Sequence, residues 1–314
     1  MSASSQSLVD EDARQTRPVP SLLNARVGDL ADIGPGTVAL AGVYCDHFGG
    51  GTPGGRFAPR QLRYAEWPAL GGPLQHIEGL VDVGDLNVYP LDAAKTAESL
   101  TRQARAIRAT GARALFVSGD YSTTPALFRG AMDGMASERR GLIRISRSAN
   151  MQAFVASTNL IGRECTTRML VDELQPSSSP WLLLLGSPLQ RLQDYVALQG
   201  LQENVLDLTL ENFQSDAQWQ SVMARFQARC DAVYLSLDVD VLSAGVVHSG
   251  HARSMDGVSP DQLLDLLRSL ATLPVLAADL TGFVPEFGVQ GRMDARVVAG
   301  LLAGMADVVR GGCR

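Results

Sequence analysis

The stretch DAVYLSLDVDVLSAG, residues 231–245, joins a continuous apolar run to two carboxylates spaced two residues apart. Such a run is typical of a strand that is buried on both faces of a parallel sheet. Side chains alternate faces along a strand, so Asp238 and Asp240 are expected to point the same way at its end. Two like charges side by side need water, cations or a metal to tolerate each other. The rest of the chain must supply those partners.

Short apolar segments alternate with amphipathic, helical stretches along most of the chain. Helices are predicted over Ala93–Thr110, from Ser259-Pro260 to about Leu270, and over about 292–309. The alternation predicts an α/β fold in three layers, with a mainly parallel eight-stranded sheet between helices. We expect a flexible N-terminal arm at 1–30 and a single domain at 31–314. The predicted strands are residues 37–45, 77–85, 113–120, 141–148, 181–187, 204–210, 232–240 and 274–280.

Composition excludes several classes of partner. The 314 residues are 46% hydrophobic and 19% charged, which is usual for a globular protein with a sizeable core. The net charge is −6 and Lys95 is the only lysine, so neither a nucleic acid nor a membrane surface is an expected partner. The four cysteines are scattered without a CxxC pair, and no signal peptide or bilayer-length apolar run occurs. We therefore expect a cytoplasmic protein with reduced thiols.

Ligands of parallel α/β sheets bind at the carboxyl ends of the strands, and polar residues gather at these predicted ends. The residues there, or in the loops that follow, are Asp46, Asp120, Tyr121, Ser146, Ser148, Asn150, Asp238, Asp240, His248 and His251. These ten residues are the candidates for a pocket.

Four segments, in order along the chain, resemble motifs of the ureohydrolase family, which contains arginases, agmatinases and formiminoglutamases. The resemblance spans about residues 36–310 and implies an arginase-type α/β/α fold and a trimer or hexamer. It also implies hydrolysis of linear amidines by a hydroxide that bridges two Mn²⁺ ions. The segments are GVYCDHFGGGTPGGRFAPRQLR (42–63), DVGDL (82–86), SGDYSTTPAL (118–127) and SLDVDVLSAG (236–245).

The family takes its metal ligands from the motifs GGDH, DAHxD and DxD, and this chain departs from that pattern. The corresponding positions are Tyr121, Ser146, Ser148, Asn150, Asp238 and Asp240. Four of the six ligands are thus replaced, including both histidines, and the substitutes are weak ligands. The sequence therefore predicts no cofactor, with Asp238 and Asp240 as remnant ligands. Ile161 and Gly282 likewise stand where the family has a histidine and a glutamate near the substrate.

Other residues of the same region leave alternatives open. His248 and His251 could join Asp238 and Asp240 in a new single-metal site, or they are ordinary loop histidines. Cys45, near His47, is either half of a thiol–imidazole pair or an inert, packed thiol.

The small polar residues at the replaced ligand positions are also open to two interpretations. Tyr121, Ser146 and Ser148 either line a pocket for a small polar ligand or fill the space that the ligands have left.

Three functional hypotheses follow. The first is a pseudoenzyme that has lost guanidino hydrolysis and acts as a non-catalytic partner or regulatory subunit, in a homo-oligomer or with a related subunit. The second is a metal-independent enzyme that reuses the pocket for a small guanidino or amino metabolite. The third is an atypical single-metal amidinohydrolase.

Overall fold

The computed structural model describes residues 20–47, 53–65, 78–152, 163–174, 179–187, 198–209, 217–250, 255–285 and 289–311. These residues form one nine-stranded sheet in the order β1-β3-β2-β4-β9-β8-β5-β6-β7, in which every pair of neighbours is parallel. The strands are β1 (Arg26–Val27), β2 (Val38–Val43), β3 (Leu80–Leu86), β4 (Arg113–Ser118), β5 (Arg140–Ser146), β6 (Trp181–Leu185), β7 (Val205–Asp207), β8 (Ala232–Asp238) and β9 (Val275–Thr281).

All eight predicted strands are confirmed, with shifts of a few residues at their ends. The ninth strand, β1, is the difference from the prediction. It has two residues, both exposed, and it pairs only with β3 at the edge of the sheet. A strand this short carries no periodic pattern that a sequence could reveal.

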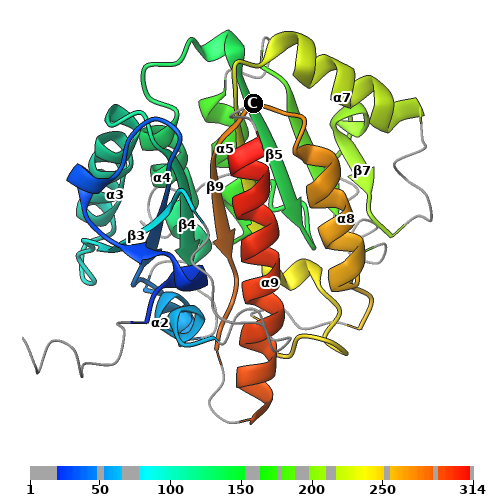
Figure 1. Ribbon diagram of the computed structural model, residues 1–314. Helices are drawn as coiled ribbons and strands as arrows, with labels where there is room; N and C mark the ends of the chain where they lie inside the picture. The colour runs from blue at the N-terminus through cyan, green and yellow to red at the C-terminus, as the bar shows by residue number, and fades with distance from the viewer. Residues whose placement is uncertain are drawn as a thin grey trace, which may run out of the picture.

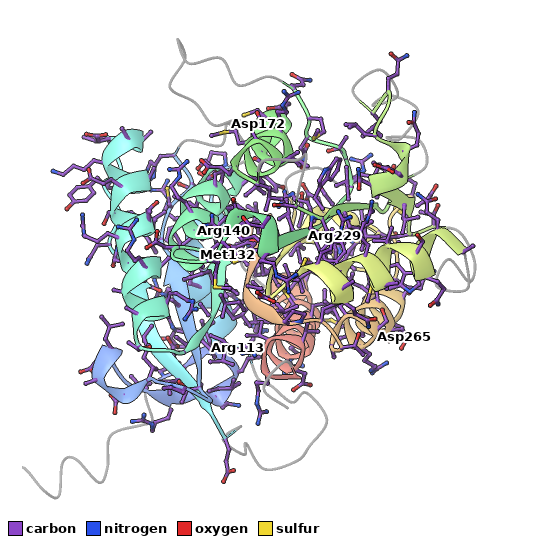
Figure 2. The ribbon with its side chains drawn as sticks, turned by 90° about the horizontal axis from the view of Figure 1, so that it is seen from above. Arg113, Met132, Arg140, Asp172, Arg229 and Asp265 are labelled. Atoms are coloured by element: carbon purple, nitrogen blue, oxygen red, sulfur yellow. The ribbon has the colours of Figure 1, made fainter. Side chains whose placement is uncertain are left out.

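Helices cover both faces of the sheet, which gives the three predicted layers. Helices α3, α4 and α5 lie on one side and α7, α8 and α9 on the other (Figures 1 and 2). Among the described residues, none of the helices combines the length and the apolar character that crossing a bilayer requires. The helices are α2 (Ala58–Arg63), α3 (Ala93–Ala109), α4 (Thr124–Ala131), α5 (Thr166–Glu173), α7 (Ala217–Arg229), α8 (Pro260–Leu270) and α9 (Val289–Gly311).

Alternation along the strands divides the core into two halves. In β5, Ile143 and Ile145 pack on the side of α7, α8 and α9, whereas Leu142 packs on the side of α3, α4 and α5. Arg144 is two residues from Leu142 and therefore shares its face. Charged residues occupy the outer surfaces of the helices instead, as the labelled Asp172, Arg229 and Asp265 show (Figure 2).

Local signals in the sequence position the predicted helices. The Asp92 side chain accepts a hydrogen bond from the backbone N of Lys95 at 2.9 Å and caps α3. Ser259 and Gln262 form a capping box around Pro260 at the start of α8. These caps satisfy backbone donors that have no partner inside the helix.

The described part of the predicted arm 1–30 contributes to the folded domain. Leu22 and Leu23 are buried in the core on the side of α9, and Leu22 N donates to Asp82 Oδ2 at 2.8 Å. With β1, these contacts place ordered structure before residue 31. Residues 1–19 lie outside the described part of the chain.

Candidate functional site

The carboxyl ends of β4, β5 and β8 bring seven of the ten candidate residues to one edge of the sheet, and six of the seven are joined by hydrogen bonds. In Figure 1 the arrowheads of β5 and β9 point downward, toward this edge. A 3-10 turn follows β4 at Tyr121–Thr123, and another follows β8 at Val239–Val241. We call the six residues the carboxyl-edge cluster: Tyr121, Ser146, Ser148, Asn150, Asp238 and Asp240.

Asp238 stands at the end of a chain of side-chain hydrogen bonds. Ser146 Oγ donates to Asp238 Oδ2 at 3.1 Å, and Asn150 Nδ2 donates to Ser146 Oγ at 3.2 Å. Ser148 Oγ in turn donates to Asn150 Oδ1 at 2.8 Å. Three residues at positions where the resemblance predicts metal ligands therefore bind one another and this carboxylate.

Asp240 has a separate partner, Tyr121, whose hydroxyl donates to Asp240 Oδ2 at 2.6 Å. Asp240 also lies in the 3-10 turn and not in the strand, so strand alternation is not what places it beside Asp238. Instead Asp238 Oδ1 accepts from the backbone N of Asp240 at 2.9 Å and caps the turn. Asp238 and Asp240 thus accept hydrogen bonds from two different sets of neutral donors.

The carboxyl-edge cluster is buried. Its most exposed members, Ser148 and Asn150, are 6% exposed, and Ser146 and Asp238 are 0% exposed. A buried polar group is tolerated when it is hydrogen-bonded, and four of these side chains donate hydrogen bonds within the cluster. The arrangement is a closed polar network within the described residues.

Asp46 and Asp120 accept hydrogen bonds from nearby residues of their own loops and do not belong to the carboxyl-edge cluster. Asp46 accepts from Gly54 N at 2.7 Å and from Arg56 Nε at 3.1 Å, which holds the loop after β2. Asp120 accepts from Ser122 N at 2.9 Å and caps the turn after β4.

The two candidate histidines do not complete a metal site among the described residues. The His248 side chain is 45% exposed, and its Nδ1 lies 3.0 Å from Gln290 Nε2 and 3.7 Å from Asp294 Oδ1. Its contacts are therefore with α9, and the alternative of a site shared with Asp238 and Asp240 gains no support. His251 lies outside the described residues, as does Ile161.

Cys45 is not an activated nucleophile. Burial raises the pKa of its thiol from 9.0 to about 12, so the thiol stays protonated at neutral pH. His47 Nε2 lies 3.2 Å from Arg56 Nη1. This environment supports the interpretation of Cys45 as a packed thiol.

Gly282, which the resemblance places at a glutamate position of the family, lies directly against the carboxyl-edge cluster. Its φ is +82°, and an added Cβ would be 2.5 Å from Asp238 Oδ1 and 2.9 Å from the Tyr121 hydroxyl. The glycine lets two hydrogen-bonded side chains occupy space that a larger residue would take.

We expect Gly282→Ala to lower the free energy of unfolding by about 3 kcal/mol, because a left-handed φ and a crowded Cβ both act against alanine. Gly84→Ala is the matched control: its φ is +83°, but nothing lies within 4 Å of the added Cβ. It should lose only about 1 kcal/mol. Urea unfolding of both variants measures the difference in their free energies of unfolding. Equal losses would show that the carboxyl-edge cluster leaves room for a Cβ at position 282.

Sequence reasoning missed Arg144, a fully buried charge beneath the carboxyl-edge cluster. Its Nη2 lies 3.9 Å from Asp238 Oδ2, and both side chains are 0% exposed. The signal was present in GLIRISRS, because an arginine inside a strand buried on both faces needs an internal partner.

Solved structures share this fold at low sequence identity. The proclavaminate amidino hydrolase from Streptomyces clavuligerus superposes with a TM-score of 0.74 at 16% identity, covering 94% of this chain and 98% of its own. A variant of the Trypanosoma cruzi formiminoglutamase, solved with Mn²⁺, has a TM-score of 0.66 at 16% identity and covers 86% and 93%.

The Trypanosoma cruzi structure corrects one prediction. Manganese is the metal bound in a formiminoglutamase of this fold, and nothing in the comparisons indicates that the cofactor has been lost. The prediction that no cofactor is used, which rested on the replaced ligands alone, is therefore wrong.

The described side chains can nevertheless be compared with the ligands that a two-manganese centre needs. Across the described ranges, no group of three or more His, Cys, Asp or Glu side chains gathers as a metal site. The cluster offers two carboxylates, and the hydroxyls of Tyr121 and Ser146 already donate to them. The described residues do not fit a binuclear centre of hard cations, which needs several anionic or imidazole ligands.

Sequence comparison agrees with the structural one. The formimidoylglutamase of Salmonella arizonae is 28% identical over 276 residues, which cover 85% of this chain and 84% of that protein. A sequence model of the arginase family matches residues 36–306, nearly the whole described domain. The chain belongs to the arginase family, the ureohydrolases.

Proposed function

We propose that this ureohydrolase-family protein does not hydrolyse guanidino or formimino compounds and acts as a non-catalytic partner or regulatory subunit. The observation that carries the proposal is the closed carboxyl-edge cluster. Hydrolysis of an amidine carbon needs an activated water and room for the substrate beside it. In this chain the side chains at the edge are buried and directed at one another.

The two carboxylates are the cluster's candidate general bases, and both are engaged by the chain itself. Asp240 accepts from the Tyr121 hydroxyl at 2.6 Å, and Asp238 accepts from Ser146 Oγ at 3.1 Å and from the backbone N of Asp240. Each carboxylate is therefore hydrogen-bonded by donors of the chain itself.

The same geometry argues against metal-independent chemistry at this edge. An enzyme that reused the family pocket would need an open cavity with convergent polar groups. Here Tyr121, Ser146 and Ser148 are buried and hydrogen-bonded within the cluster or to their surroundings, so they fill space. The proposal therefore favours the space-filling interpretation of these residues.

The partner in this proposal is another copy of the chain or a related ureohydrolase subunit. The family resemblance implies a trimer or hexamer, and this assembly stays a prediction. Light scattering of the purified chain, alone and mixed with an active relative, would measure it.

The experiment that tests the proposal is a screen for product release with added Mn²⁺. Arginine, agmatine and guanidinobutyrate would release urea, and formiminoglutamate would release formamide. The Salmonella arizonae formimidoylglutamase is the positive control, and the metal content of both proteins is measured in the same samples. We expect no product above the blank, whatever the metal content. Product release that disappears in Asp238→Asn would contradict the proposal.

A further inference from the structure

Arg144 is a buried cation in the middle of β5. It faces α3, α4 and α5, and its neighbour on β8 is Ser236, which in turn neighbours Asp279 on β9. Arg144 Nη1 donates to Ser236 Oγ at 2.5 Å. A guanidinium keeps its charge at every pH at which proteins fold, so its burial at 0% exposure requires an anion nearby.

Two carboxyl groups face this guanidinium, and they differ in how well each can balance its positive charge. Asp238 Oδ2 lies 3.9 Å from Arg144 Nη2, within ion-pair distance. Asp279 is fully buried, and burial raises the pKa of its carboxyl, which favours its neutral form. Asp238, by contrast, accepts hydrogen bonds from Ser146 and from the backbone N of Asp240.

The guanidinium acts mainly through its charge. Arg144 Nε and Nη2 find no hydrogen-bond partner among the described residues, so directional bonding to Asp238 is absent. In a buried environment the attraction between opposite charges at this separation is much larger than in water. One positive charge is therefore fixed beneath the carboxyl-edge cluster.

The geometry assigns Arg144 as the chain's own counter-cation for Asp238. The family's two-metal chemistry places cations from solution against this carboxylate, whereas here a side chain on the neighbouring strand supplies the positive charge. This explains how a fully buried Asp238 is balanced although the described residues do not fit a binuclear centre. The assignment concerns the charge of the site and holds whether or not the chain has a catalytic role.

A double-mutant cycle tests the assignment. We expect Arg144→Met to lower the Tm by on the order of 10 °C, because it leaves Asp238 buried without its cation. Adding Asp238→Asn removes the orphaned charge while keeping an acceptor for Asp240 N, and should restore at least half of the loss. If Arg144→Met does not accumulate as soluble protein, the same comparison is made on soluble yield.

Asp279→Asn is the matched control, because it removes the other carboxyl that faces Arg144. The Arg144→Met/Asp279→Asn protein should gain no more Tm than Asp279→Asn alone adds to the wild type. A larger gain with Asp279→Asn and none with Asp238→Asn would overturn the assignment, and so would simple additivity of Arg144→Met and Asp238→Asn.

Chemical rescue gives an independent readout. Arg144→Ala leaves a space with the shape of a guanidinium, and about 20 mM guanidinium chloride should raise the Tm of this variant by several degrees. Urea has nearly the same shape and no charge, so the same concentration should not raise it, and neither should potassium chloride. Equal effects of guanidinium and urea would show that filled volume, and not charge, is what Arg144 supplies.

Discussion

Restoring the four replaced ligands, in the variant Tyr121→His/Ser146→Asp/Ser148→His/Asn150→Asp, is expected to lower the Tm by on the order of 10 °C in the absence of metal. Ser146 Oγ lies 3.1 Å from Asp238 Oδ2, so an aspartate there places a second carboxylate against the first. The histidine at position 121 also removes the hydroxyl that donates to Asp240 at 2.6 Å. The closed network becomes a set of repelling charges.

Adding Mn²⁺ should reverse that loss, because the new carboxylates and imidazoles are ligands that a hard or borderline cation accepts. The measurement is the Tm of the variant and of the wild type in EDTA and in MnCl₂. The upward shift should be larger in the variant than in the wild type, and Asp238→Asn added to the variant should reduce it. A variant as stable as the wild type in EDTA would show that these four positions do not surround the two carboxylates.

Replacing Asp279 should change how stability depends on pH. Burial raises the folded-state pKa of this carboxyl above its ordinary value of 3.8. Above about pH 4 the unfolded chain releases this proton while the folded protein keeps it, so the wild type loses stability as pH rises toward the folded pKa. The slope from this one group reaches about 1.4 kcal/mol per pH unit.

Asp279→Asn removes the titrating group, so the variant should gain stability relative to the wild type as the pH rises from about 5 to 8. Urea unfolding at several pH values measures the difference. Asp231→Asn is the control: its partner Arg139 lowers the Asp231 pKa, so its contribution is constant over this range. Parallel curves for Asp279→Asn and the wild type would mean that Asp279 is ionised in the folded state.

The layers of the fold could be predicted because each buried strand is a compact apolar run. The segment AVYLSLD of β8 is buried at all seven positions, and such runs bounded by helical patterns leave little choice of architecture. β1 carries no such run, so it was missed. The ordered segment before residue 31 carries no such run either, since the buried Leu22 and Leu23 lie in a 3-10 turn of three residues.

Which residues form the site could be predicted in part, but the hydrogen bonds between them could not. Motif order placed Tyr121, Ser146 and Asp238 at one edge, because the carboxyl ends of parallel strands meet there. Which hydroxyl binds which carboxylate depends on contacts across 92 to 119 residues of sequence. His248 illustrates the limit, since it follows the DxD strand in sequence yet contacts α9.

Counting metal-ligand residues in the sequence led to two opposite errors, one about the cofactor and one about Arg144. Counting ligand types predicted that the metal was lost, although a relative of the same fold is solved with Mn²⁺. The same counting passed over an arginine that is not a ligand type but carries a positive charge 3.9 Å from Asp238. The charge balance of a buried site depends on all the groups within reach, and these are known only from the fold.

Single-turnover assays with the protein in excess over radiolabelled agmatine and formiminoglutamate, in the presence of Mn²⁺, test the central claim most directly. If the carboxyl-edge cluster is closed by its own hydrogen bonds, labelled product should form no faster than in buffer. Product that forms in proportion to protein concentration, and that the Asp238→Asn protein fails to form, would contradict it.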